Sequence, residues 1–293
     1  MKNKVVLVIG GSGFLGSHVA DALSNDGYDV KVLDRQRSKW IRDDQEMIIG
    51  DLLDQDILFQ STKNCYAVYN FAAIADLNEA ILQPLETVRV NILGNVQALE
   101  ASRKNHVKRY VYASTVYVNR REGGFYRCSK QASENYVEEY QKSYCLDYTI
   151  LRYGSLYGPR SDSQNGLWRI VKNVIETGIV KYEGNIESVR EYIHVEDAAK
   201  ASVIALGDEF KNEHVVLTGH EPLKVIDMLK MLSEILGIQE EVQFENLSYA
   251  GHYIRTPYAY KTKLGRKFIP PMHVDLGQGL IQLIENIKNS NTK

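Results

Sequence analysis

Tyr126, Lys130 and Thr115 have the residue types and spacing for proton transfer from an alcohol. Tyr126 and Lys130 are four residues apart, so a helix would place them one turn apart on one face. A free phenol, with a pKa of about 10, is a weak base at neutral pH, but a nearby ammonium stabilises the phenolate and lowers that pKa. We therefore expect Tyr126 to act as general base, Lys130 to assist it, and Thr115 to hold the substrate oxygen.

A glycine-rich stretch near the amino terminus could bind the oxidant for such an alcohol. An apolar run over 5–9, typical of a buried parallel strand, breaks directly into Gly10, Gly13 and Gly16, and a helical pattern follows over 17–23. These glycines allow a tight turn, close approach of a pyrophosphate, and close packing of helix on strand. The helix N-terminus offers unpaired N–H groups to phosphate. The stretch predicts a dinucleotide site; its predicted contacts also include Phe14 and Leu15.

The second predicted strand, over 29–33, ends in Asp34, eighteen residues after Gly16. A carboxylate at this place bonds the ribose hydroxyls of NAD and repels the 2′-phosphate of NADP. Arg35, a further predicted cofactor contact, lies beside it with Arg37, and an adjacent arginine can accommodate that phosphate. NAD is favoured as the cofactor, with Lys130 also expected to grip the nicotinamide ribose beside Tyr126.

Alternating strands and helices in the first half predict a doubly wound parallel sheet, which is a Rossmann α/β fold. Further strands are expected over 46–49, 67–71, 108–113 and 147–151, and long helices over 85–104 and 128–142. The small residues Ala72 and Ala73 follow the fourth strand, at the sheet edge where ligands bind in such folds. The same edge would hold the glycine loop and Thr115.

The pattern loosens after Gly158-Pro159, which indicates a smaller, discontinuous substrate-binding domain. We assign residues 1–155 and about 190–219 to the NAD-binding domain, and about 156–189 and 220–293 to the substrate domain. A strand and helix over 190–206 are expected to rejoin the main sheet, as is the segment 213–218. Final helices are expected over 223–236 and 273–287.

Composition is typical of a soluble globular protein: 293 residues, 44% hydrophobic and 25% charged, with a net charge of −2. This near-neutral balance argues against a nucleic-acid surface or a polybasic membrane surface. The sequence shows no cleavable signal or membrane-spanning run, and its three cysteines lack CxxC or metal spacing. We expect a cytoplasmic protein with buried thiols and no metal site.

A series of short motifs runs in order along nearly the whole chain: Gly10-Gly-Ser-Gly-Phe-Leu-Gly16, Asp34, Gly50-Asp-Leu52, Asn70-Phe-Ala-Ala73, Asn91-Ile-Leu-Gly-Asn95, Tyr112-Ala-Ser-Thr115, Tyr126-x-x-x-Lys130, Leu151-Arg-Tyr-Gly-Ser-Leu-Tyr-Gly-Pro-Arg160 and Arg190-Glu-Tyr-Ile-His-Val195. In number and order these motifs resemble those of the extended short-chain dehydrogenase/reductase family, in its nucleotide-sugar epimerase/dehydratase branch. The resemblance implies an NAD-dependent enzyme with a nucleotide-sugar substrate.

The same resemblance implies further cofactor contacts. Tyr153 would lie under the nicotinamide, and Asn91 would stand behind the active site in a structural role. The remaining residues would flank the adenine or line the cofactor: Asp51, Leu52, Ala72 and Ala73.

Substrate contacts are also implied by the resemblance. Arg190 resembles an arginine that binds the diphosphate of the substrate, and Arg255 is a weaker match to a second such arginine. Asn165 is a candidate for the same diphosphate. A surface ion pair is the alternative role for each arginine.

Two departures from the family pattern narrow the reaction. Dehydratases of this family have Asp-Glu directly after the threonine, to remove the C6 hydroxyl, whereas this chain has Val116 and Tyr117. Elimination is therefore not expected, nor is the decarboxylation for which relatives carry a glutamate there. Only ten residues separate Thr115 from Tyr126, where the family has a longer, proline-rich loop, so we expect a wider pocket for a larger sugar.

The resulting prediction is oxidation of a nucleotide-sugar hydroxyl, at C4, with Tyr126 as base and NAD as oxidant. An epimerase, favoured by analogy, would return the hydride to the other face of the sugar. A 4-dehydrogenase would release the keto sugar, and a 4-keto reductase would run the reaction in reverse. Alternatives from other classes are a non-catalytic NAD-sensing module and a sterol or flavonoid alcohol reductase. The two long helices resemble those of an intersubunit four-helix bundle, which predicts a homodimer.

Overall fold

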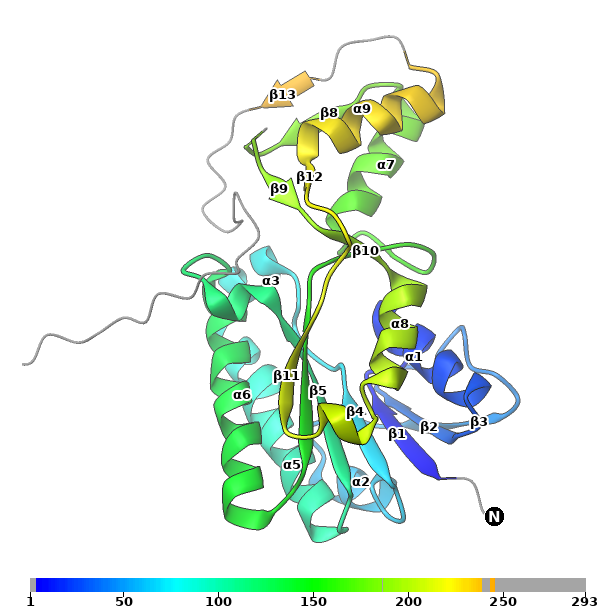
Figure 1. The fold of residues 1–293 in the computed structure, drawn as a ribbon, viewed down its shortest axis with the longest axis vertical. Coiled ribbons are helices and arrows are strands. Elements are labelled where there is room, and N and C mark those ends of the chain that lie inside the picture. Colours follow the sequence, from blue (N-terminus) through cyan, green and yellow to red (C-terminus); the bar gives the residue numbers. More distant parts are fainter. Residues whose placement is uncertain (1–3, 186, 239–242, 246–293) are drawn as a thin grey trace, which may run out of the picture. The chain divides into compact units, whose positions relative to one another are not determined.

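The computed structural model describes residues 4–185, 187–238 and 243–245. Its centre is one sheet of parallel strands: β1 (Val5–Ile9), β2 (Asp29–Asp34), β3 (Gln45–Ile49), β4 (Ala67–Asn70), β5 (Arg109–Thr115), β6 (Tyr148–Tyr153) and β11 (Glu213–Leu217). The seven strands lie in the order β11-β6-β5-β4-β1-β2-β3 (Figure 1). The order reverses at β1 and β4, where ligands bind in open α/β sheets. The predicted α/β fold class with a doubly wound parallel sheet is confirmed.

Helices cover both faces of the sheet: α1 (Phe14–Asn25) and α8 (Val195–Ile204) lie on one face, and α2 (Gln55–Ser61), α5 (Asn95–Lys104) and α6 (Gly124–Tyr144) on the other (Figure 1). Successive strand residues point to opposite faces. In β1, Val6 and Val8 therefore join the core under α1 and α8, whereas Leu7 and Ile9 join the core under α2, α5 and α6. These four side chains are at most 1% exposed, so β1 is anchored on both faces.

The long helix predicted over 85–104 is confirmed as a continuous run of α4 (Pro84–Thr87), a π-helical turn η1 (Val88–Gly94) and α5. Asn91 lies within the π turn and is 1% exposed. Its Oδ1 accepts a hydrogen bond from the Ile74 N–H at 2.8 Å, and its Nδ2 donates to the Ile74 carbonyl at 3.0 Å. Single π turns inside helices occur mostly at functional sites. Here the turn directs an amide toward the segment that follows β4.

Helix α6 begins at Gly124, four residues before its predicted start. Gly123 precedes it with a φ of +97°, in the left-handed region that glycine adopts readily. A Cβ at this position would lie 2.9 Å from the side chains of Tyr117 and Arg127. Together with the short 3-10 helix η2 (Val116–Asn119), this glycine lets the connection from β5 turn directly into α6.

The prediction that the strand after residue 189 rejoins the main sheet is wrong. β9 (Val189–Arg190) pairs with β12 (Leu223–Lys224), and β10 (Tyr192–His194) pairs with β7 (Ser155–Tyr157), in two separate small sheets. The place beside β6 is already taken by β11, with Val215 opposite Leu151. The prediction that residues 213–218 join the main sheet is confirmed by β11.

The remaining described elements are α3 (Leu77–Leu82), α7 (Gly166–Thr177), β8 (Lys181–Glu183), η3 (Asp208–Phe210), α9 (Val225–Leu236) and β13 (Gln243–Glu245). Helices α7 and α9 share a small core of their own, which includes Val174, Val225 and Leu229. Helix α9 confirms the helix expected over 223–236. The helix expected over 273–287 lies outside the described residues. The division into an NAD-binding and a substrate domain stays a prediction.

The prediction of buried thiols holds for Cys65 and is wrong for Cys128 and Cys145, which are exposed. Cys128 lies on the solvent side of α6, and Cys145 ends that helix in a left-handed conformation, with a φ of +57°. Within the described ranges, no helix is long and apolar enough to cross a membrane. In that same part of the chain, no three of the His, Cys, Asp and Glu side chains gather closely enough to hold a metal ion.

Candidate active site

The structure brings the three predicted catalytic residues together at the carboxyl end of β5. Thr115 is the last residue of β5 and is 5% exposed, and Tyr126 and Lys130 lie on the first two turns of α6. The Thr115 hydroxyl is near enough to the Tyr126 phenol to lower its pKa. Lys130 Nζ lies 5.8 Å from the centre of the Tyr126 ring. A phenol, a hydroxyl and an amine thus converge on one place.

Burial changes the acidity of both groups on α6. It raises the pKa of Tyr126 to about 12, and an interaction with the nearby Thr115 hydroxyl opposes this change. It lowers the pKa of Lys130 to about 7, against the attraction of Glu134. At neutral pH the protein alone therefore has a neutral phenol beside an amine that is about half protonated.

Backbone and side-chain hydrogen bonds fix the first turns of α6. Lys130 Nζ donates to the Ala113 carbonyl of β5 at 2.7 Å. Ser129 Oγ donates to the Tyr126 carbonyl at 2.8 Å and accepts from Asn91 Nδ2 at 2.9 Å. Asn91 thus connects the π turn to the start of α6, and this arrangement supports the structural role expected for it.

The glycine loop after β1 passes directly against the segment after β4. Gly10 has a φ of +76°, and a Cβ on it would lie 2.6 Å from the Ala72 nitrogen. A Cβ on Gly16 would collide with the Gly10 carbonyl oxygen. Gly13 differs, because a Cβ there would meet only the Gly10 carbonyl, at 3.4 Å. Packing within the protein therefore requires glycine at positions 10 and 16, whereas position 13 has room.

Asp34 ends β2 beside this loop, as the sequence predicts. Its Oδ2 accepts a hydrogen bond from the Ser12 N–H at 3.0 Å, and its Oδ1 accepts a longer one from the Gln36 N–H at 3.4 Å. Arg35 is exposed next to it. The carboxylate is therefore held at the edge of the glycine loop.

Phe14 and Leu15 form the first turn of α1, directly after Gly13, which is the N-cap. The Phe14 ring meets His18 edge to face at 6.2 Å, and Leu15 packs against the core shared by α1 and α8. Their side chains thus support the helix start, and their backbone N–H groups are the ones that a helix N-terminus offers to a phosphate.

The residues expected along the cofactor lie at the carboxyl ends of β3 and β4. Asp51 accepts a hydrogen bond from the Leu53 N–H at 2.8 Å. Leu52 is 6% exposed and packs on Gly94 of the π turn, where a Cβ would lie 2.6 Å from its Cδ2. Ala72 adjoins the glycine loop, and Ala73 follows it, half-buried. This edge therefore consists of small or tightly packed residues.

Tyr153 has a different environment from the other predicted contacts. It ends β6, is 5% exposed, and its hydroxyl lies 2.7 Å from Ser202 Oγ of α8. Burial raises the pKa of Tyr153 beyond that of a free phenol, so the hydroxyl is neutral. The hydroxyl is engaged within the core, and contact with the nicotinamide stays a prediction.

The predicted substrate residues lie on separate elements. Asn165 caps α7, because its Oδ1 accepts from the Trp168 N–H at 3.1 Å while its Nδ2 donates to the Leu156 carbonyl at 2.9 Å. Arg190 is 7% exposed in β9, and its Nη1 donates to the Val189 carbonyl at 3.0 Å. Arg255 lies outside the described residues.

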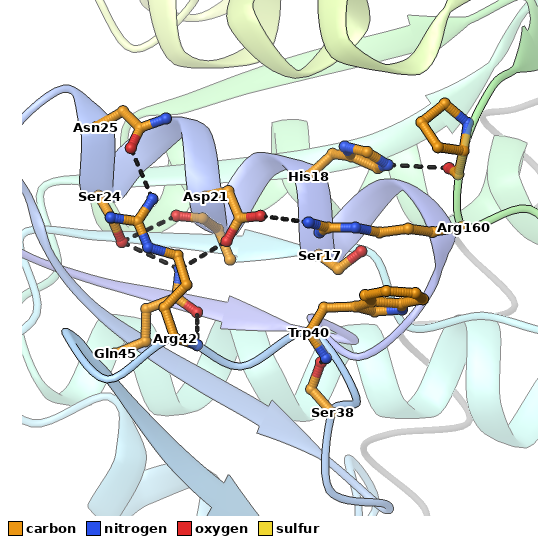
Figure 2. A network of polar contacts seen from close by, with 12 residues as sticks. Ser17, His18, Asp21, Ser24, Asn25, Ser38, Trp40, Arg42, Gln45 and Arg160 are labelled. Atoms are coloured by element: carbon orange, nitrogen blue, oxygen red, sulfur yellow. Dashed lines mark hydrogen bonds and ion pairs between the residues drawn. The ribbon is translucent and has the colours of Figure 1, made fainter.

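Arg160 holds the segment after β7 to α1 and to the loop after β2 (Figure 2). Its Nη2 donates to Asp21 Oδ2 at 2.7 Å, and its guanidinium carbon lies 4.9 Å from the centre of the Trp40 ring. His18 Nε2 lies 3.0 Å from the Pro159 carbonyl oxygen, and burial lowers the pKa of His18. The neutral imidazole can donate this bond from Nε2. The helix that starts at the glycine loop is thereby joined to the residues that lead into α7.

Two observations test whether these residues fit a dinucleotide. Gly13 caps α1 without a side-chain hydrogen bond from the described residues, so the first turn offers its N–H groups to an anion. Asp34 offers a carboxylate beside the same loop, which suits ribose hydroxyls. N–H donors for phosphate next to an acceptor for a diol match the chemistry of NAD.

Sequence reasoning missed a buried ion pair behind the site. The Glu134 side chain is 7% exposed and accepts hydrogen bonds from Ser114 Oγ at 2.5 Å and from Arg152 Nε at 3.0 Å and Nη2 at 2.7 Å. The sequence does indicate that Glu134 belongs to the site, since it follows Lys130 by one helical turn. Ser114 and Arg152 directly precede Thr115 and Tyr153 at the strand ends.

Comparisons with known proteins point to one family. The profile of the family described as "NAD dependent epimerase/dehydratase family" matches residues 6–218. A UDP-glucose 4-epimerase of Thermus thermophilus, solved in complex with NAD, is 28% identical and has a TM-score of 0.76, with 87% of this chain and 90% of that chain covered. A UDP-glucose 4-epimerase of Thermotoga maritima, solved with UDP-glucose, is 27% identical with a TM-score of 0.79 and the same two coverages. A dTDP-glucose 4,6-dehydratase of Streptomyces niveus is 24% identical over 96% of this chain and 91% of its own length.

Proposed function

Because the chain belongs to the NAD-dependent epimerase/dehydratase family, we propose that it oxidises the C4 hydroxyl of a nucleotide-diphosphate sugar to a keto sugar. Bound NAD would take the hydride from the sugar carbon and, in the epimerase that we favour, return it to the opposite face. The observation that carries this proposal is the convergence of Tyr126, Lys130 and Thr115 at the end of β5. Strand β5 lies next to β4, which is one of the two strands at which the strand order reverses.

In this proposal Tyr126 removes the proton of the sugar hydroxyl and holds it on its phenol oxygen. Protonated Lys130 stabilises the phenolate that this step requires, because an opposite charge nearby favours ionisation. The Thr115 hydroxyl, which is close to the phenol, would orient the sugar oxygen toward it. In the reverse step Tyr126 returns the proton to the sugar, so an epimerase consumes no external acid or base.

The proposed cofactor contacts surround the start of α1. Asp34 would bind the adenosine ribose, and the N–H groups after Gly13 would bind the pyrophosphate. Lys130 would bind the nicotinamide ribose, which would supply the hydroxyl partners that its amine needs to regain a full charge. The other proposed contacts are Gly10, Phe14, Leu15, Gly16, Arg35, Asp51, Leu52, Ala72, Ala73, Tyr126 and Tyr153.

We infer further that the enzyme does not catalyse a 4,6-dehydration. Removal of a C6 hydroxyl needs an acid and a base beside the sugar. The two residues after Thr115 are Val116, which is 3% exposed, and Tyr117, and neither carries a carboxylate. Since similar proteins include a dTDP-glucose 4,6-dehydratase, product analysis has to test this inference.

The test is incubation of the purified protein with a panel of UDP-, GDP- and dTDP-sugars. Sugar products are identified by NMR, and reduced nicotinamide is followed by its absorbance. An inverted hydroxyl without net NADH would establish an epimerase and name its substrate. NADH that accumulates with a keto sugar would make it a dehydrogenase, and a 6-deoxy-4-keto product would overturn the inference on dehydration. NAD binding without turnover of any sugar would favour the NAD-sensing module.

We propose that the active form is a homodimer built on the helices beside the site. Several large apolar side chains on these helices are about half exposed or more, whereas large apolar side chains are usually buried in a folded protein. Leu82 and Leu85 are 80% and 81% exposed. The other members of this surface are Ile81, Val88, Leu93 and Phe125.

A further inference from the structure

Glu134 lies one helical turn behind Lys130, buried in the network that joins α6 to β5 and β6. We propose that Glu134 is a positioning residue for the proposed reaction, which fixes the end of β5 against α6 and places its carboxylate one helical turn from the Lys130 amine. The catalytic role of Glu134 rests on the proposed function. The effect of its charge on Lys130 can be measured without any substrate.

The geometry of the network places Glu134 between the two strand ends of the site. Ser114 and Arg152 face each other in the register of β5 and β6, and both donate to the same carboxylate. Ser114 is followed directly by Thr115, which is the residue proposed to hold the sugar oxygen. Glu134 therefore fastens the strand that carries Thr115 to the helix that carries Tyr126 and Lys130.

Glu134 is paired with the guanidinium of Arg152. Arg152 gives it two hydrogen bonds, at 3.0 Å and 2.7 Å, to the two oxygens of the carboxylate. A bidentate pair of this kind is strong and directional. Loss of one partner would leave the other charge buried and uncompensated, which is strongly destabilising.

The charge of Glu134 also acts on Lys130. Side chains four residues apart on a helix are neighbours, with Cβ atoms about 6 Å apart. Glu134 is the group whose attraction raises the pKa of Lys130 against the effect of burial. A neutral side chain at 134 would remove this attraction. The change favours the neutral amine, which could no longer stabilise the Tyr126 phenolate.

The surroundings of the carboxylate contain other titratable groups, and one of them offers a control. His214 Nε2 of β11 lies 3.1 Å from Glu138 Oε1 and 4.0 Å from Glu134 Oε2. Glu138 is one turn further along α6, and its side chain is 32% exposed. The described charged or titratable groups that face Glu134 or Lys130 are Tyr112 of β5, Tyr148 and Arg152 of β6, His214 of β11, and Tyr126 and Glu138 of α6.

The experiment follows the titration of Lys130 in the whole protein. Lysine labelled with an isotope at Cε is observed by NMR, and the Lys130 signal is identified by its loss in Lys130→Arg. We expect the titration midpoint to fall by about one pH unit or more in Glu134→Gln, a tenfold change in the protonation equilibrium. Glu138→Gln changes the same charge on the same helix and should leave the midpoint unchanged.

A second variant separates the effect of the Glu134 charge on Lys130 from any loss of stability. Glu134→Gln combined with Arg152→Gln removes both charges and leaves amides that can hydrogen-bond to each other. We expect this double variant to be more stable than Glu134→Gln and still to show a lowered Lys130 midpoint. If a sugar substrate is turned over, the acid limb of its kcat/KM profile should move to higher pH in both variants, because a neutral lysine raises the pKa of Tyr126.

The outcomes are distinguishable from those of the proposed function. An unchanged Lys130 midpoint in Glu134→Gln, or in the double variant if the single one does not fold, would overturn the proposal and leave Glu134 with a role in stability alone. A lowered midpoint in a protein that turns over no nucleotide sugar would support the electrostatic role and count against the proposed reaction.

Discussion

The Lys130 amine lies 5.8 Å from the centre of the Tyr126 ring, close enough for its charge to influence ionisation of the phenol. Burial opposes both charges, because it raises the pKa of Tyr126 to about 12 and lowers that of Lys130 to about 7. At neutral pH the protein alone therefore has a neutral phenol and an amine that is about half protonated, whereas the proposed reaction needs an ammonium beside a phenolate. In the proposed function, NAD binding would favour the ammonium, and the ammonium would favour the phenolate.

Tyr126→Phe should lose turnover, because it removes the phenol oxygen that takes the proton in the proposed reaction. General base catalysis contributes about 10²–10⁴-fold, so a loss of that size is expected in kcat. Tyr136→Phe is the matched control, since Tyr136 lies on the same helix and is 46% exposed. Steady-state kinetics on the substrate from the sugar panel, with thermal melting and NAD binding as checks on folding, measure the effect. Full activity in Tyr126→Phe would rule out the assigned base.

Lys130→Met should change how stability depends on pH. The folded pKa of Lys130, about 7, lies below that of an unfolded lysine, about 10.4, so the unfolded chain binds more protons between these values. The wild type should therefore gain stability from Lys130 as pH rises from about 7 to about 10, on the order of 4 kcal/mol in total. The variant should lack this gain and be relatively more stable near pH 6.

The measurement for Lys130→Met is the melting temperature of both proteins across this pH range. Lys142→Met, at an exposed position of the same helix, is the control and should follow the wild type. Parallel curves for wild type and Lys130→Met would show that Lys130 keeps an ordinary pKa.

Gly16→Ala should lower the stability of the protein, whereas Gly13→Ala should weaken NAD binding. A Cβ at position 16 collides with the Gly10 carbonyl, so Gly16→Ala should melt at a clearly lower temperature. A Cβ at position 13 meets only one atom, at 3.4 Å, so Gly13→Ala should change stability by about 1 kcal/mol or less. It should still weaken NAD binding by about tenfold or more, because the methyl group would lie in the path proposed for the pyrophosphate. The affinity for NAD is measured by calorimetry. If Gly13→Ala bound NAD as tightly as the wild type, the phosphates would have to bind elsewhere.

Asp34→Asn should weaken NAD binding and reduce the preference for NAD over NADP. The carboxylate is held by the Ser12 N–H, and a hydrogen bond from a sugar hydroxyl to a charged group is worth about 1.5–3 kcal/mol. The expected loss of NAD affinity is therefore about 10- to 100-fold, with little loss for NADP. Asp43→Asn, an exposed change of the same charge on the loop after β2, serves as control. Equal losses for both cofactors would argue against contact with the ribose.

Leu85→Glu should convert the proposed homodimer into a monomer. Leu85 is 81% exposed, and a buried, unpaired carboxylate in a dimer interface is strongly unfavourable. Ile175→Glu is the control, because Ile175 is 68% exposed on α7 and is not one of the residues of that surface. Light scattering at several protein concentrations measures the mass. A wild type that is monomeric throughout would remove the dimer from the proposal.

The sequence by itself determined the features that depend on neighbouring residues. The apolar run of β1, the glycine spacing after it and the alternation of strands with helices are local patterns, so the parallel sheet could be predicted from them. The same holds for Tyr126 and Lys130, because a separation of four residues on a helix defines their relative direction. The site residues on strand ends followed from the rule that parallel strands present their carboxyl ends at one edge.

Only the tertiary structure decided which segments compete for a place and which charges are buried together. β10 pairs with β7 because β11 occupies the edge beside β6, and no local pattern reveals this competition between distant segments. The carboxylate of Glu134 meets Ser114 and Arg152 from two different strands, and desolvation by several elements lowers the pKa of Lys130. Burial is a sum over neighbours brought from all parts of the chain, so acidity and ion pairing at the site could not be predicted from spacing along one segment.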